Sequence, residues 1–394
     1  MAISKNQYIY NITASYINEK KEIKIPDGSI LACYITYDYE LTNSPLFIMK
    51  VKINSSLYNT MQDTKDTGKL VVGIGRSSSN SGTPVRYIYK QFSYHFPTKK
   101  FSNIEQSMDG TAPKRDDSNA YVNAIIGLVD DSIMNANRLA MVNNIFRNSN
   151  NISIIHYYTS AMRMIIEPFD YMDPMDLCIL PPMESVGQLL KYLNTISSFY
   201  STDYRFFMDF NYTYLLSNKG NSIDIKDGTF STIEINVDKE TEEKGLGADY
   251  KQKIYTLQVK EDQIEYSDDD LTEKKFNKLY AIDSSGNKNI TELDIPRSYD
   301  SKDRYKLIRL PNDNTHYLEN YKSNAENSGS PITVAIADMD NSLFVPYKQF
   351  IFSFFRERRS CNGVYILSRK QEVYIAQGDG TFYSTMVLRF KKKH

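Results

Sequence analysis

Two pairs of carboxylates are the side chains of this sequence whose type and spacing come nearest to catalytic chemistry. Asp203 and Asp209 flank an aromatic run, while Asp338 and Asp340 stand two positions apart. Glycoside hydrolysis needs two carboxylates that face each other across a sugar ring, one as acid and one as base or nucleophile. The first pair is therefore a candidate for that reaction. The second pair, like the acidic run 268–270, is a candidate for holding a divalent cation.

Histidine and cysteine form no pattern of a metal site or of an activated nucleophile. No two histidines stand three or four positions apart, as they do on a zinc-binding helix. The cysteines lie beside strand-like or core-like sequence, where a buried thiol is inert. The run Gly73-x-Gly75-x-x-Ser78 lacks the following helix that a phosphate-binding loop requires. We therefore predict that the chain is not an enzyme and has no catalytic, cofactor-binding or metal-binding residue.

Composition indicates a globular chain of two or three domains, because 394 residues are many for one core. With 47 basic against 48 acidic residues, the charge balance argues against a nucleic-acid clamp or a membrane surface. Cys33, Cys178 and Cys361 are odd in number and far apart, so a disulfide framework is not expected. No apolar run approaches the length of a signal peptide core or a membrane span, which predicts folding in a cytoplasm.

The order of strand-like and helix-like segments predicts a β-rich α+β fold in three regions. Residues 1–110 hold β-branched and aromatic runs at 30–39, 46–53, 69–74 and 86–96, which are typical of a small barrel. Residues 111–220 form an α/β middle region, with helical patterns at 120–134 and 139–146 and an undecided pattern at 151–166. Residues 221–394 return to short strands, and the polar segments near 238–250 and 312–331 are predicted to be inserted loops.

The clearest local pattern lies in residues 180–217. Pro181 and Pro182 end the preceding element, and Ser185 is a plausible N-cap. A helix over 185–200 is predicted because apolar residues follow at helical spacing: Val186, Leu189, Leu190, Leu193, Ile196 and Tyr200. The aromatic run 205–216 then predicts strands that pack on that apolar stripe.

This succession of residues resembles the central segment of the tail hub proteins of contractile-tailed bacteriophages. The residues that carry the resemblance are Pro181-Pro182, Leu190-Lys-Tyr192-Leu193, Phe199-Tyr200, Phe206-Phe207-Met-Asp209-Phe210 and Tyr214-Leu215-Leu216. The match is strongest over 175–217, with looser support from the β-rich first third and the last fifty residues. The segments 238–250 and 312–331 have no counterpart in the family.

The resemblance implies two tube-type β-barrel domains, at 1–110 and 221–394, around the middle region. It further implies a homotrimer that adapts a hexameric tail tube to a trimeric central spike and lines the channel for genome ejection. Its partners would be the tube, the spike, other baseplate proteins and passing DNA, with no cofactor and no stable membrane association. The expected location is the virion tail or baseplate, after assembly in the host bacterial cytoplasm.

Two alternatives to a structural hub stay open, as does the choice between a phage tail and a related bacterial contractile device. One is a tail-associated cell-wall hydrolase that uses Asp203 and Asp209. The other is a receptor-binding tail protein that uses exposed tyrosines, since the chain has 31 tyrosines and no tryptophan.

Overall fold

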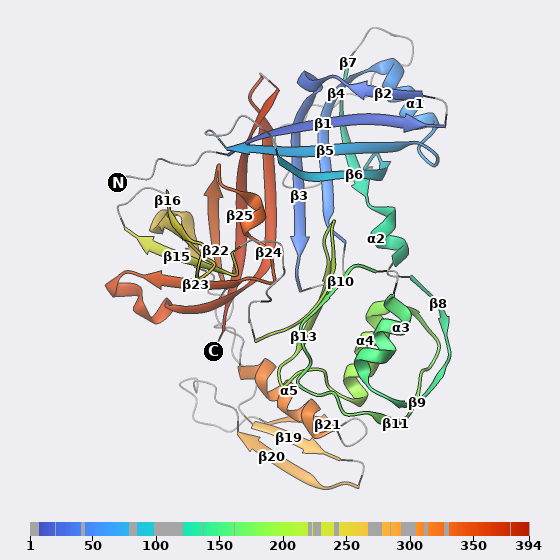
Figure 1. Ribbon diagram of the computed structural model, residues 1–394, viewed down its shortest axis with the longest axis vertical. Helices are drawn as coiled ribbons and strands as arrows, with labels where there is room; N and C mark the ends of the chain where they lie inside the picture. The colour runs from blue at the N-terminus through green and yellow to red at the C-terminus, as the bar shows by residue number, and fades with distance from the viewer. Residues whose placement is uncertain are drawn as a thin grey trace.

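The structure is a computed structural model in which two β units lie side by side and a mixed middle region lies below them (Figure 1). It describes residues 8–19, 21–40, 44–78, 85–97, 121–136, 138–160, 162–219, 223, 230–239, 244–266, 278–283, 285–292, 305–310, 314–326, 331–378 and 380–393. The predicted fold class, β-rich α+β, is confirmed. No helix within these ranges has the length and apolar character needed to cross a membrane.

The first β unit is a closed barrel of eight strands. Its strands are β1 (Tyr8–Asn18), β3 (Ile30–Asp38), β4 (Leu46–Asn54), β5 (Lys69–Ser78), β6 (Val85–His95), β7 (Tyr121–Val129), β24 (Gly363–Ala376) and β25 (Thr381–Lys392). They pair in the order β24-β3-β4-β7-β6-β5-β1-β25, and the pairing of β24 with β25 closes the ring. β2 (Lys21–Ile25) extends from β1, and η1 (Asp27–Ser29) and α1 (Ser55–Asp63) connect strands.

The second β unit is built on the same β24–β25 hairpin. It adds β15 (Thr232–Asp238), β16 (Lys244–Asp249), β17 (Ile254–Lys260), β18 (Ile264–Tyr266), β22 (Pro331–Ala337) and β23 (Gln349–Phe354), with the short helices η3 (Glu261–Gln263), η6 (Asn341–Leu343) and η7 (Arg356–Cys361). The order is β16-β17-β15-β23-β24-β25-β22-β18, and no pairing between β16 and β18 occurs among the described residues. Among the described residues, this sheet therefore has two edges without a paired strand.

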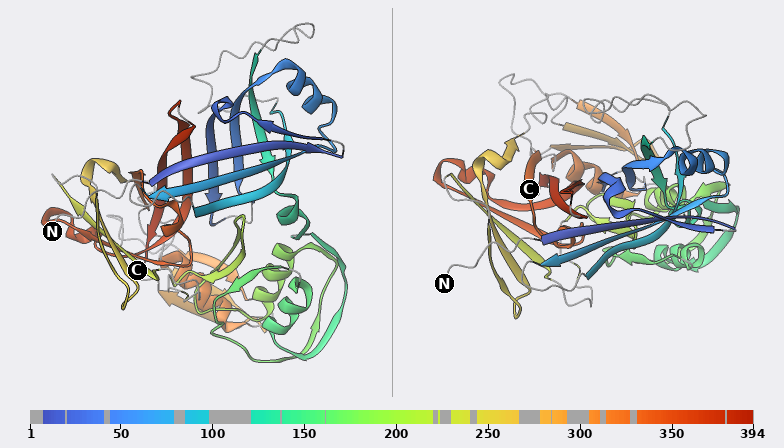
Figure 2. Two further views of the ribbon diagram at one scale, coloured as in Figure 1. Left: turned by 45° about the horizontal axis from the view of Figure 1, so that its top comes forward. Right: turned by 90° about the horizontal axis from the view of Figure 1, so that it is seen from above.

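One hairpin thus belongs to both units, as Figure 2 shows by the red strands between the blue and yellow ones. The carboxyl-terminal half of β24 pairs with β3, and its amino-terminal half pairs with β23. The register of the β24–β25 pair shifts between Leu367 and Arg369, where one half gives way to the other. The domain division at residues 110 and 221 stays a prediction. One continuous sheet contains strands from both sides of these boundaries.

The middle region contains α2 (Asp131–Ala136), β8 (Arg138–Val142), β9 (Ile145–Ser149), α3 (Asn151–Thr159), β10 (Met164–Ile166), β11 (Met175–Ile179), β12 (Met183–Ser185), α4 (Val186–Ile196), β13 (Tyr204–Met208) and β14 (Thr213–Ser217). The helical prediction at 120–134 was wrong except at its end, where α2 begins at Asp131, and the one at 139–146 was wrong. The first covers β7, where Val122, Ala124, Ile126 and Leu128 are buried at the alternating spacing of a strand. The second covers β8 and β9, which pair with β12 and β11.

The prediction for α4 is confirmed. Its N-cap is Ser185, whose Oγ accepts a hydrogen bond from the backbone N–H of Gln188 at 3.2 Å. Val186, Leu189, Leu190 and Leu193 are fully buried, as one apolar stripe requires. The helix ends at Ile196, four residues before the predicted end, and the buried Phe199 and Tyr200 lie in the turn that follows.

Both predicted loops were wrong in part, because each contains a regular element. The 238–250 segment includes β16, an edge strand that pairs with β17. The 312–331 segment includes α5 (Thr315–Glu326), whose Tyr317, Leu318 and Tyr321 pack on a small separate core of Ala281, Ile308 and Leu310. That core lies under a three-stranded sheet of β19 (Lys278–Ile282), β20 (Lys288–Glu292) and β21 (Tyr305–Arg309).

The buried stripe of α4 gives a direct test of this core. Replacing Leu190 and Leu193 together by Asp buries two carboxylates without partners, which no native core of this size tolerates. We expect insoluble or unfolded protein by circular dichroism. Lys191→Asp, on the exposed side of the same helix, is the matched control and should fold normally. A soluble double variant with native circular dichroism would contradict the packing described.

Candidate functional site

The structure separates the two carboxylates proposed for glycoside hydrolysis. Asp203 and Asp209 lie at opposite ends of β13, so six extended steps put them roughly 20 Å apart. Hydrolytic pairs stand about 5 to 10 Å apart. Asp209 instead caps the turn into β14: its Oδ1 accepts the backbone N–H groups of Asn211 and Tyr212 at 2.7 and 2.8 Å. Its Oδ2 accepts the Tyr214 hydroxyl at 2.6 Å.

The other candidate acids do not gather either. Asp340 caps η6 through Ser342 and is paired with the guanidinium of Arg76, while Asp338 has a left-handed backbone with φ of 51°. The acidic run 268–270 lies outside the described residues. Within the described residues, no three His, Cys, Asp or Glu side chains come together as a metal site would need.

The remaining sequence candidates occupy structural positions. Burial raises the pKa of the Cys33 and Cys178 thiols, which keeps both protonated and poorly nucleophilic. Gly73 and Gly75 lie inside β5, between β1 and β6, and not in a phosphate-binding loop. A Cβ at Gly73 would lie 2.9 Å from Thr13 Oγ1, so the glycine permits close strand packing.

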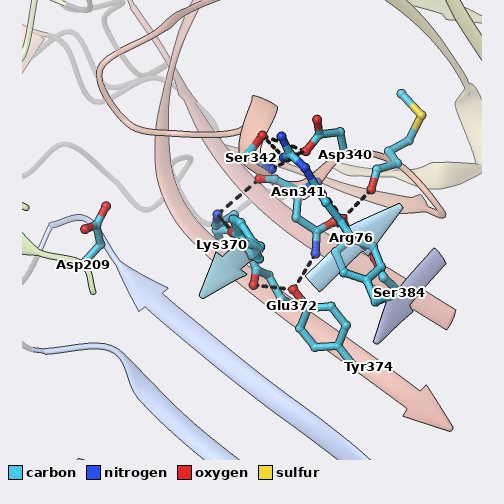
Figure 3. A network of polar contacts seen from close by, with 12 residues as sticks. Arg76, Asp209, Asp340, Asn341, Ser342, Lys370, Glu372, Tyr374 and Ser384 are labelled. Carbon is cyan, nitrogen blue, oxygen red and sulfur yellow. Dashed lines mark hydrogen bonds and ion pairs between the residues drawn. The ribbon is translucent and has the colours of Figure 1, made fainter. Parts of the chain in front are cut away.

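The main polar cluster was missed from the sequence and lies inside the first barrel on β24 (Figure 3). The side chains of Lys370 and Glu372 are 3% and 0% exposed, and Lys370 Nζ lies 2.8 Å from Glu372 Oε1. Tyr374 donates its hydroxyl to Glu372 Oε2 at 2.9 Å, and the Tyr87 hydroxyl donates to Oε1. Lys370 Nζ also lies 4.6 Å from the centroid of the Tyr37 ring. The buried pair is thus surrounded by tyrosines.

Asn341, in η6, ties this cluster to the loop that follows β22. Its side-chain Nδ2 donates to the Tyr374 hydroxyl at 2.9 Å, and its Oδ1 accepts the Ser384 hydroxyl at 3.1 Å. Its backbone N–H donates to the Tyr10 hydroxyl at 3.0 Å, which in turn donates to Met339 O at 2.9 Å. Strands β1, β24 and β25 and the η6 loop therefore share one hydrogen-bond network.

Burial raises the pKa of Tyr10, Tyr87 and Tyr374 well above the ordinary value for tyrosine, and nearby Glu372 adds to the effect. These hydroxyls therefore stay protonated and serve as donors. Burial also raises the pKa of Asp209, against the hydrogen bonds that it accepts. The arrangement holds charges in place among hydroxyls that stay protonated.

The middle region packs against the first barrel beside this polar cluster. The turn between β13 and β14 places Phe210 against three barrel residues: its ring centroid lies 5.8 Å from that of Tyr37, 6.0 Å from Phe47 and 5.4 Å from Phe92. Phe210 is 3% exposed. The aromatic run predicted to pack in the core thus acts as a plug, and the resemblance segment is where the middle region meets the barrel.

A β-bulge explains why the sequence did not reveal Lys370 and Glu372. Before the register shift, odd-numbered Tyr365 and Leu367 point inward; after it, even-numbered Lys370, Glu372 and Tyr374 do. An uninterrupted alternation would have placed the charged residues on the outer face. The only sequence signal was that change of phase between two apolar runs.

Comparison with known proteins places the chain in a family. The family described as Bacteriophage PBS1 gene 109 protein matches residues 2–393. The chain belongs to this family. No curated protein matches it in sequence.

Two solved structures share the fold. A tail protein from Neisseria meningitidis MC58 is 10% identical with a TM-score of 0.53, and the alignment covers 97% of each chain. The 43 kDa tail protein of prophage MuSo2 from Shewanella oneidensis is also 10% identical with a TM-score of 0.53, over 98% of this chain and 97% of that one. Family and fold together confirm the resemblance and support a structural protein of a phage tail or baseplate.

The buried pair can be tested by a double-mutant cycle. Lys370→Met or Glu372→Gln alone leaves the opposite charge buried without its partner and should lower the free energy of unfolding by about 3 to 5 kcal/mol. The double variant should lose clearly less than the sum, as measured by urea unfolding. Lys24→Met, which breaks an exposed pair with Asp27, is the control and should cost at most about 1 kcal/mol. Additive effects at Lys370 and Glu372 would refute the coupling.

Proposed function

We propose that this chain is the hub at the end of a phage tail, where three copies adapt a hexameric tube to a trimeric spike and line the channel for the genome. The observation that carries the proposal is the pair of eight-stranded β units built on one shared hairpin. Three copies would present six such units, which is the number that a sixfold tube requires. Features that occur once per copy would occur three times in the assembly, as a threefold partner requires.

The open edges of the second unit support assembly. β16 and β18 end the strand path without a partner among the described residues. Exposed edges invite pairing with another chain, and a native protein usually covers them. A ring of identical subunits uses two different surfaces per copy, and its rotation must close. In the proposed hub, neighbouring copies cover these edges.

The chemistry of the chain supports a non-enzymatic role. The separation of Asp203 from Asp209 removes the pair on which the cell-wall hydrolase alternative rested. The two ion pairs of the buried network, Lys370 with Glu372 and Arg76 with Asp340, engage all four of these charges. The proposed partners are other copies, the tube, the spike and further baseplate proteins, with DNA passing through the lumen. The proposed location is the virion tail, after assembly in the cytoplasm of the host.

Solution mass tests the proposal. Light scattering of the purified 45.5 kDa chain, alone and mixed with the spike protein of the same phage, should give three copies per particle. Negative-stain images of that peak should show a threefold ring with an open lumen. A chain that remains a compact monomer in both samples would contradict the hub.

A further inference from the structure

A hollow remains where the plug meets the barrel, between the β13–β14 turn, the strands of the first barrel and the loop after η6. Its volume is about 280 Å³. One water takes up about 30 Å³ of liquid, so the hollow exceeds a single hydration site. Pockets for drug-sized ligands begin near 300 Å³, so this one suits a single small ring. Arg86 and Asn211 line it and are exposed, which marks its solvent side.

The walls combine aromatic rings with fixed polar groups. The lining includes Tyr39, Tyr212, Arg86, Asn211, Asp209 and Lys370. The Arg86 guanidinium lies over Tyr89 at 4.6 Å, and Asp209 is held by its three hydrogen bonds. Such walls offer flat apolar faces together with donors and acceptors that are already oriented.

The charges around the hollow balance. Lys370 is paired with Glu372 and Arg76 with Asp340, which leaves Arg86 and Asp209 as one charge of each sign. A site with an excess of cations would select an anion, whereas a balanced one gives an anion no net attraction. The charge therefore favours an uncharged ligand that hydrogen-bonds to both kinds of group.

Tyr39 offers a hydroxyl to the hollow. Tyr39 is 1% exposed, and its ring packs on Tyr37 at 6.0 Å and on Phe207 at 5.1 Å. Burial raises the pKa of this tyrosine well above its ordinary value, so the hydroxyl remains a donor. Because the hollow is lined by Tyr39, a group bound there can accept a hydrogen bond from this hydroxyl.

We propose that this hollow is a binding site for one neutral saccharide ring. Sugar hydroxyls supply the donors and acceptors that Tyr39, Arg86, Asn211 and Asp209 call for, and the C–H faces of the ring pack on tyrosine. This goes beyond the hub role. It gives the chain a place where a glycan end can dock at the junction of barrel and plug.

Saturation-transfer NMR on the full chain tests the site, with D-glucose, D-galactose, N-acetyl-D-glucosamine and L-rhamnose as separate millimolar probes. We expect binding of at least one sugar. Tyr39→Phe keeps the ring and removes one hydrogen bond, so it should weaken that binding between about twofold and tenfold. Arg86→Ala should weaken it as well. Tyr383→Phe, on an exposed tyrosine outside the barrel, is the matched control and should bind like the unaltered chain.

Several outcomes overturn the proposal. If none of the four sugars gives a saturation-transfer signal, the hollow holds solvent only. Equal binding by Tyr39→Phe and Tyr383→Phe places the sugar elsewhere. Binding of inorganic phosphate in preference to every sugar makes the hollow an anion site. Light scattering of the same variants keeps the two proposals apart, because the saccharide site can fail while the threefold assembly stands, and the reverse.

Discussion

The β24–β25 hairpin is the constraint on which the rest of the structure depends. Both strands are long enough to pair in two sheets, with β3 and β1 in the barrel and with β23 and β22 in the second unit. Neither unit has all its strands without this hairpin. The bulge between Leu367 and Arg369 lets one strand serve two sheets, because it changes which side chains point inward.

The buried polar network follows from that sharing. After the bulge, the inward positions of β24 carry Lys370 and Glu372 and not further apolar residues. A buried ion pair adds little net stability compared with an apolar pair, but it penalises every arrangement that leaves a charge unpaired. With Asn341 bridging to Tyr374 and Ser384, the network therefore fixes how β24, β25 and the η6 loop meet. The Phe210 plug then completes the barrel from the middle region.

Sequence patterns predicted those elements in which local and tertiary signals agree. Ser185 and the stripe through Leu193 specify α4 by cap and period, and no other element competes for that segment. Strand β7 was mistaken for a helix because its alternating residues run directly into α2, so a single sequence window mixed the strand and helix periods. Helix α5 was mistaken for a loop because few apolar residues cover its small core. The burial of Lys370 was missed because a bulge cannot be located from the sequence of one strand alone.

The candidate site shows the same limit. Asp209 stood out in the sequence as a possible catalytic acid, yet its neighbours make it a turn cap. The hollow beside it is lined by residues from β3, β5, β6, the β13–β14 turn and β24, so no stretch of sequence contains it. Barrel closure by the shared hairpin brings these residues together, and local periodicity carries no information about that closure.

Native-state hydrogen exchange read by mass spectrometry tests the central claim, that one hairpin makes the two β units a single cooperative structure. The account predicts that amides of β3 and β4 in the barrel, β15 and β23 in the second unit, and β24 itself open with one common free energy, equal to that of global unfolding. Two distinct free energies, with the second unit opening while the barrel stays protected, would contradict it.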